Sequence, residues 1–114
     1  MFSEARKRLY AVLTSAVGED KVAHMAWVKG KDPDLPWAVY YDEPEGEGAD
    51  NENWCVRHMW TVELHELSSD SEFEMAVFSD LADEYGYVEP PLGSSDSSDG
   101  HYICVYRFSE IERM

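Results

Sequence analysis

Hydrophobic residues recur every three or four positions near the start of the chain, which is the spacing of an amphipathic helix. The apolar positions of residues 2–20 that follow this spacing are Phe2, Ala5, Leu9, Val12, Leu13 and Ala16. Ser3 can cap the beginning of this segment, and Gly18 stands where a helix commonly stops. The sequence therefore predicts a first helix that buries one side.

A second helical pattern occupies residues 68–86. Ser71 and Glu74 have the spacing of a capping box, and Gly86 provides a stop. The apolar stripe between these signals consists of Phe73, Val77, Leu81 and Tyr85, with Phe78 beside it. Both ends of a second helix are thus predicted.

The stretch WCVRHMWTVELHEL, residues 54–67, has a period of two instead. Its even positions are Trp54, Val56, His58, Trp60, Val62 and Leu64, whereas the odd positions include Arg57, Thr61, Glu63 and His65. This pattern predicts a long strand with one buried face. It also separates His58 from Glu63 and His65, so residues that look like a cluster in the sequence are divided between two faces.

Three other segments favour strands. Residues 21–30 contain valines and a tryptophan between two turn signals, and WAVYY follows Pro36. In HYICVYRF, residues 101–108, both alternating sets are largely apolar, which indicates an interior strand. The intervening segments 42–53 and 90–100 contain little that could be buried, so we expect exposed loops there, the second of them mobile.

The order helix, strand, strand, long strand, helix, loop, strand describes an α+β domain. We expect a single domain over residues 1–114, with a mostly antiparallel four-stranded sheet and two helices packed against it. A chain of 114 residues is long enough to bury a core without disulfides or metals.

Charge restricts the possible partners. The chain has 24 Asp and Glu but only 9 Lys and Arg, a net charge of -15 at pH 7. Sequence-specific nucleic-acid binding and attraction to an anionic membrane both need clustered cations, so neither is expected. No apolar run reaches the roughly 18 residues of a membrane span, and no signal peptide is recognisable, which predicts a cytoplasmic protein. A solvated acidic surface, a basic partner and mimicry of DNA remain open.

The chemistry-bearing residues do not form a recognisable active site. Cys55, His58, His65, His101 and Cys104 lack the paired spacing of a zinc site. Glu63 and Glu66 point to opposite faces of a strand, so they cannot act as a pair. The acidic loops do not fit a calcium-binding pattern, and no phosphate-binding or nucleophile motif is present. We therefore expect neither an enzyme nor a cofactor, and two reduced, packed cysteines that adjacent strands could still bring together.

The succession of motifs resembles the small tail completion, or tail terminator, proteins of long-tailed bacteriophages and prophages. The pieces that carry the resemblance, within residues 25–108, are MAWVKG, LPWAVYYDE, ADNEN, WTVELHEL, YGYVEP and HYICVYRF. The chain departs from the family pattern after Leu64, where HEL replaces the usual tyrosine and threonine, and in its serine-rich segment before the last strand.

The resemblance implies a non-enzymatic structural role. Such a protein is assembled in the cytoplasm of the bacterial host and sits in the tail or neck of the virion, where it ends tail growth or joins tail to head. It forms a ring, typically of six subunits, and contacts tail-tube or head–tail connector proteins. The expected assembly positions lie in the two loops: Asp42, Glu43, Glu45, Glu47, Asp50, Asn51, Asn53, Ser94, Asp96 and Asp99. The alternative is an acidic DNA mimic, or another binding module, that inhibits a basic host protein.

Overall fold

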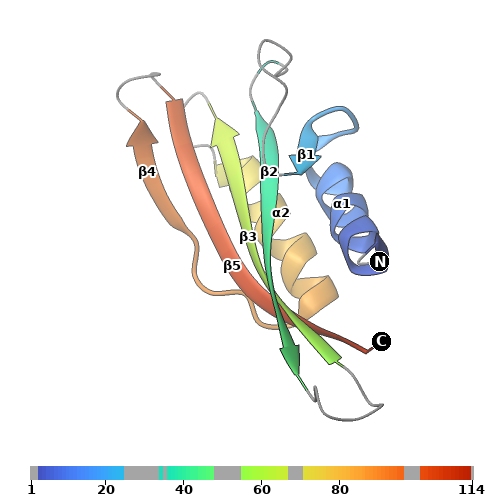
Figure 1. Ribbon diagram of the computed structural model, residues 1–114. Coiled ribbons are helices and arrows are strands. Elements are labelled where there is room, and N and C mark those ends of the chain that lie inside the picture. Colours follow the sequence, from blue (N-terminus) through green and yellow to red (C-terminus); the bar gives the residue numbers. More distant parts are fainter. Residues whose placement is uncertain are drawn as a thin grey trace.

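The computed structural model describes residues 3–24, 34, 36–47, 55–66, 71–96 and 101–113. Their fold is α+β, as predicted, with two helices and a sheet (Figure 1). The elements in chain order are α1 (Ser3–Val17), β1 (Val22–His24), β2 (Trp37–Glu47), β3 (Cys55–Glu66), α2 (Ser71–Tyr85), β4 (Leu92–Asp96) and β5 (His101–Arg113).

The sheet of the described residues has five strands in the order β1-β2-β3-β5-β4. β1 pairs with β2 in parallel, and the other three pairs are antiparallel. The expectation of a four-stranded, mostly antiparallel sheet is therefore wrong in strand number and misses the parallel pair. The additional strand is β4, whose sequence LGSSD has almost no apolar residue to signal a strand.

Both helices end where their glycines predict. Gly18 and Gly86 follow the last helical residues with φ of 112° and 86°, values that a side chain would make unfavourable. The amide of each glycine still donates to the carbonyl four residues back, Thr14 and Ala82 respectively. The helical periodicity of the sequence was thus sufficient to place α1 and α2.

The core lies between the sheet and the two helices, which cover the same face (Figure 1). Leu9 and Leu13 of α1, and Val77 and Leu81 of α2, are fully buried. The sheet residues that meet them come from alternating positions: Tyr40, Trp60, Val62, Leu64, Cys104, Tyr106 and Phe108. The even register predicted for residues 58–64 is confirmed.

Tyr106 joins the sheet to α2. Its hydroxyl donates a hydrogen bond to the backbone carbonyl of Glu74 at 2.9 Å. Burial, together with a hydrogen bond to Cys104, raises the pKa of Tyr106 well above its ordinary value of 10.0. The phenol therefore stays protonated and remains a donor to the helix.

The sheet is longer than the helices that cover it. The 13 residues of β5 extend over about 43 Å at roughly 3.3 Å per residue, whereas the 15 residues of α2 extend over about 22 Å. In Figure 1 the ends of β2 and β3 accordingly reach past both helices. Part of the sheet therefore has neither of the described helices on either face.

The two segments predicted as loops are partly strands. Residues 42–47 continue β2 and pair with residues 55–60 of β3, and residues 92–96 form β4. Hydrogen bonds between backbones do not require apolar side chains, so the polar character of these segments does not prevent pairing. The remainder of both predicted loops lies outside the described residues.

Candidate functional site: an uncovered sheet face

The face of the sheet that points away from the helices is a candidate assembly surface. It is built from the odd positions of β2, β3 and β5, because successive side chains of a strand alternate between faces. The strand registers place Tyr41, Thr61 and Arg107 in one row and Glu43, Met59 and Ser109 in the next. We call this surface the outer face.

Several large apolar side chains are exposed on or beside the outer face. Met59 and Ile111 lie on β3 and β5, and Leu92 of β4 is paired with Val105. Tyr87, which precedes β4, is 72% exposed. A group of exposed large apolar residues that share one face is typical of protein–protein contact sites, whereas single exposed ones are ordinary.

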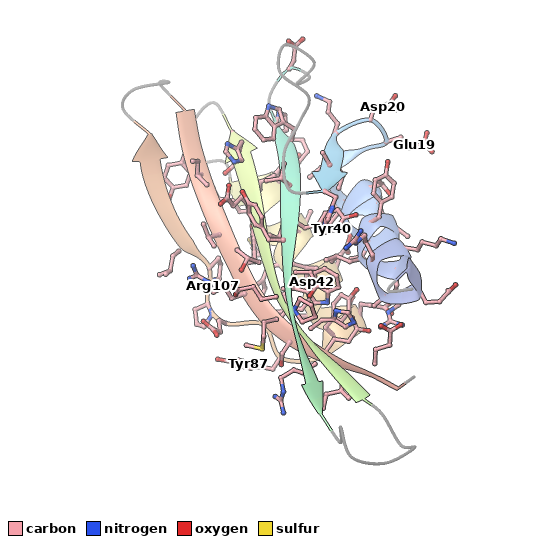
Figure 2. The ribbon with its side chains drawn as sticks, viewed as in Figure 1. Glu19, Asp20, Tyr40, Asp42, Tyr87 and Arg107 are labelled. Carbon is pink, nitrogen blue, oxygen red and sulfur yellow. The ribbon has the colours of Figure 1, made fainter. Side chains whose placement is uncertain are left out.

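A shallow hollow of about 200 Å³ opens among these residues. The residues that line it are Glu43, Met59, Trp60, Thr61, Tyr87, Glu89, Arg107, Phe108 and Ser109. Tyr87 and Glu89 come from the connection between α2 and β4, and Figure 2 shows Tyr87 and Arg107 on the same side of the molecule. The hollow is smaller than the roughly 300–1,000 Å³ of ordinary small-molecule sites, and its size suits a single inserted side chain.

The local chain path explains how the hollow forms. The amide of Glu89 donates to the carbonyl of Arg107 at 2.9 Å, so the connection runs along the edge of β5. Val88 is buried in the core. Its neighbours Tyr87 and Glu89 consequently point the other way and form a wall of the hollow.

A polar group lies farther along the outer face. His65 Nε2 and Glu63 Oε1 are 3.1 Å apart, and the His65 ring stacks on Trp37 with 4.1 Å between centroids. Burial, and after it the Glu63 carboxylate, raises the pKa of the Tyr41 hydroxyl, which is hydrogen-bonded to Glu63. These side chains order one another, and His65 and Glu63 lie away from His58 as the sequence predicted.

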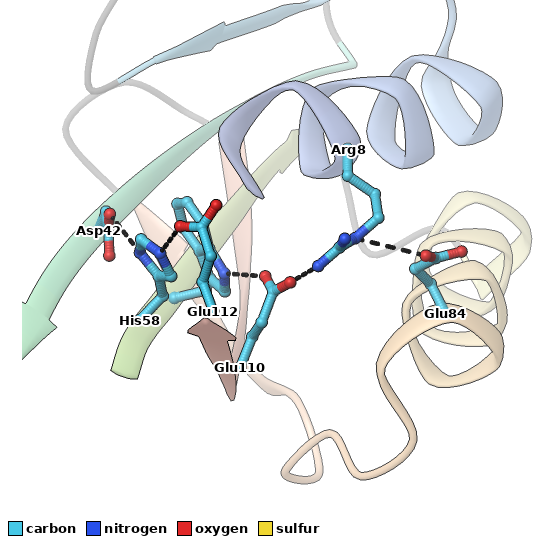
Figure 3. Close-up of polar contacts among 7 residues, drawn as sticks. Arg8, Asp42, His58, Glu84, Glu110 and Glu112 are labelled. Carbon is cyan, nitrogen blue, oxygen red and sulfur yellow. Dashed lines mark hydrogen bonds and ion pairs between the residues drawn. The ribbon is translucent and has the colours of Figure 1, made fainter. Parts of the chain in front are cut away.

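On the helix-covered face, His58 is fully buried between two carboxylates (Figure 3). Its Nδ1 is 2.8 Å from Asp42 Oδ2 and its Nε2 is 2.8 Å from Glu112 Oε1. Each ring nitrogen of His58 thus meets one carboxylate. The arrangement ties β2, β3 and β5 together near their far ends.

A second ionic link connects this end of the sheet to both helices. The guanidinium of Arg8 on α1 pairs with Glu110 on β5, and its Nε is 3.5 Å from Glu84 on α2. Glu110 also accepts a hydrogen bond from the Trp60 indole at 3.1 Å, and the Trp60 ring stacks on His58. Sequence reasoning missed this network, since Arg8, Glu84 and Glu110 come from distant elements.

The predicted assembly residues lie in different parts of the structure. Asp42 lies in β2 and not in a loop. Its side chain is only 4% exposed and bonds to His58. Glu43 is exposed and lines the hollow. Glu45, Glu47, Ser94 and Asp96 are in β2 and β4, and the positions of their side chains are not described. Asp50, Asn51, Asn53 and Asp99 lie outside the described residues.

The cysteines cannot meet each other. Strand pairing puts Cys55 opposite Arg113 and Cys104 opposite Leu64, nine residues apart along β3. That spacing corresponds to about 30 Å, far beyond disulfide reach. Cys104 is a free thiol in the core, and burial raises its pKa. The possibility that adjacent strands bring the two cysteines together is therefore wrong.

The described part of the chain shows neither a metal-binding cluster nor a membrane-spanning helix. No group of three or more His, Cys, Asp or Glu residues there is arranged to hold a metal ion. Neither described helix has the length and apolar character needed to cross a membrane.

Comparison with known proteins identifies the fold. The structure is similar to a chain in a solved structure described as the virion of a native gene transfer agent particle, with a TM-score of 0.65. The match covers 93% of this chain and 92% of the other at 8% sequence identity, so it establishes a shared fold. No protein-family model and no curated protein matches the sequence.

Proposed function

We propose that this chain is a non-enzymatic structural protein of a phage-like particle, which completes the tail or joins it to the head by assembling into a ring. Its partners would be further copies of itself, six in the simplest case, and tail-tube or connector proteins. Its location would be the bacterial cytoplasm during assembly and then the tail or neck of the virion.

The observation that carries this proposal is the outer face, which neither described helix covers, with its exposed apolar residues. A monomer gains nothing from leaving Met59, Tyr87, Leu92 and Ile111 in water, whereas an assembly can bury them at about 25 cal/mol for each Å² of apolar surface. The fold shared with a chain of a gene transfer agent virion also supports a structural role in a phage-like particle.

Charge supports a position on the path of DNA. With a net charge of -15, a ring of these chains would repel the phosphate backbone and let DNA pass without being retained. The acidic inhibitor is the rival function. It would place carboxylates over its binding surface, whereas the outer face combines carboxylates with exposed methionine, tyrosine, leucine and isoleucine side chains.

The test is light scattering after size-exclusion chromatography over a concentration series, for the chain alone and with purified tail-tube protein. We expect a ring, or a complex that forms with the tube protein. Met59→Lys should weaken assembly because it puts a charge on the outer face, whereas Lys7→Ala on the exposed side of α1 should not. A monomer that ignores the tube protein and binds a basic nuclease would instead support the inhibitor.

A further inference from the structure

We propose that the last part of β5, from Ser109 to Arg113, accepts an extended basic segment of a different protein as an additional strand, with one lysine or arginine of that segment in the hollow. We call this part of β5 the open edge. The inference goes beyond the proposed self-assembly, because it concerns a different protein and does not depend on ring formation. Two features carry it: the free backbone groups of the open edge, and the shape and charge of the hollow beside it.

The open edge has backbone groups without a strand partner. β4 pairs with β5 only as far as Val105, and the amide of Glu89 donates to the carbonyl of Arg107. No strand of the described residues pairs with this side of β5 after that point. The N–H and C=O of one strand residue point to the same side, so those of Ser109 and Ile111 point outward like the Arg107 carbonyl. Such a row of free donors and acceptors is a template for another strand.

The opposite edge of the sheet is protected against such an addition. β1 pairs with β2 only as far as Tyr40. The amide of Ala38 donates toward β1, to the carbonyl of Lys21, so the even residues of β2 direct their backbone groups to this edge. One of these even residues is Pro44, which has no N–H to donate. A proline on an edge strand hinders pairing with another chain, so the sheet can grow at β5 but not at β2.

The hollow lies beside the open edge. Ser109, Met59 and Glu43 form one row across β5, β3 and β2, and all three line the hollow. The side chain of Ser109 is short, so a long side chain from an added strand can pass over it toward Met59. The volume of about 200 Å³ suits one such side chain. The hollow can therefore select one residue of the added strand.

Charge selects a basic residue. Two carboxylates, those of Glu43 and Glu89, line the hollow together with one guanidinium, that of Arg107. Neither carboxylate forms an ion pair with a described residue. Arg107 belongs to the row of Thr61, next to the row that ends at Glu43. A cation that enters over the second row thus approaches a carboxylate, whereas an acidic side chain would be repelled from both sides of the hollow.

The apolar lining suits the rest of a basic side chain. Lysine and arginine lay their aliphatic stems on apolar surfaces and keep the charged group near water or a carboxylate. Met59 and Tyr87 provide such a surface in the hollow. The ring of Tyr87 can also attract a cation through its face. One lysine or arginine would thus satisfy both the apolar and the acidic residues of the hollow.

The occupant should be a different protein because a second copy fits poorly. The sheet cannot continue from the open edge into β2 of another copy, where Pro44 lacks a donor. Antiparallel pairing of two open edges centred on Ile111 would put Glu110 of one copy beside Glu112 of the other, and like charges at such positions destabilise a sheet. The chain as a whole has a net charge of -15, which favours a basic partner.

The experiment measures the binding of synthetic peptides to the full chain by fluorescence anisotropy. The probe is a short labelled peptide in which lysine alternates with valine, and the matched control has glutamate in place of lysine. We expect the lysine peptide to bind at least about tenfold more tightly. Two further lysine peptides carry backbone N-methyl groups, one on the lysines and one on the valines. One of them should bind about tenfold more weakly than the parent, because its methyl groups replace the donors that face β5.

Substitutions in the protein test the same contact from the other side. Ile111→Pro removes an N–H that points outward and does not bond to β3, so it should weaken binding of the lysine peptide about tenfold while the chain stays folded. Ile111→Val keeps that N–H and is the matched control, with a change below about twofold. Glu43→Gln and Glu89→Gln should each weaken binding about two- to fivefold. Circular dichroism verifies that each variant is folded.

The outcomes separate the parts of the inference. Equal binding of the lysine and glutamate peptides would overturn the basic occupant. Full binding by both N-methylated peptides would overturn the strand addition, and this arm does not depend on any variant folding. Absence of binding at millimolar peptide would overturn the inference as a whole. Ring formation is measured separately by light scattering, so none of these results decides the proposed structural role.

Discussion

Replacing His58 by leucine should be one of the most destabilising single changes in this protein. Leucine keeps an apolar side chain beside Trp60, but it leaves Asp42 and Glu112 without their donor. Leaving a buried acceptor without its hydrogen-bond donor costs about 1–3 kcal/mol, and more when the acceptor is charged. Asp42 is 4% exposed and bears most of this loss, whereas Glu112 is 20% exposed and retains some water. We therefore expect a loss of about 3 kcal/mol in the free energy of unfolding.

The assay is urea denaturation at pH 7, followed by circular dichroism, with Glu43→Gln as an exposed control that should change stability by less than about 0.5 kcal/mol. The double variant Asp42→Asn/His58→Leu has no isolated charge at position 42. It should recover at least about 1 kcal/mol relative to His58→Leu alone. A His58→Leu protein within about 1 kcal/mol of the original, or a double variant less stable than the single one, would refute the reasoning.

Three further predictions concern the core and pH. Leu81→Ala should lower the free energy of unfolding by about 2–5 kcal/mol in urea titration, because Leu81 is fully buried, and a loss below 1 kcal/mol would contradict this. Tyr106→Phe should cost about 1–2 kcal/mol by the same assay, since the Glu74 carbonyl loses its donor; an unchanged midpoint would argue against that bond. Burial and the Arg6 charge lower the pKa of His24 below 6.5. The unfolded chain therefore binds the proton more readily than the folded one, and the stability that this group contributes falls as the pH drops below 6.5. His24→Gln should flatten the dependence of stability on pH between 7 and 5, and an equally steep profile would exclude this contribution.

Much of the fold could be predicted because its main elements have clear periodicity. Four of the six even positions of β3 are apolar, which set the register from His58 to Leu64, and both helices end at glycines. β4 could not be recognised, because LGSSD pairs through its backbone and has only one large apolar side chain. The parallel contact of β1 with β2 involves three residues per strand, which is too short to leave a pattern.

The candidate site was less predictable. Residues 42–47 look like a loop because they are acidic and contain proline and glycine, yet they extend β2 opposite β3. Asp42 bonds to His58, which is 16 positions away in the chain. His58 in turn bonds to Glu112, which is 54 positions away from it. The hollow likewise combines Glu43, Met59, Tyr87 and Arg107 from different elements. One signal was available: the odd positions of β3 and β5 include the apolar residues Met59 and Ile103, and a face in contact with solvent alone has no need of apolar side chains.

The excess length of the strands over the helices divides the molecule into regions that should open independently. Where the helices cover the sheet, backbone amides become accessible only when the core separates, so their hydrogen exchange should report global unfolding. Toward the ends of β2, β3 and β5, past the link formed by His58, neither of the described helices covers the sheet. Those amides can exchange through local fraying while the rest of the domain stays folded. The free protein would thus keep strand ends with little stability of their own, which a neighbouring subunit could hold in place.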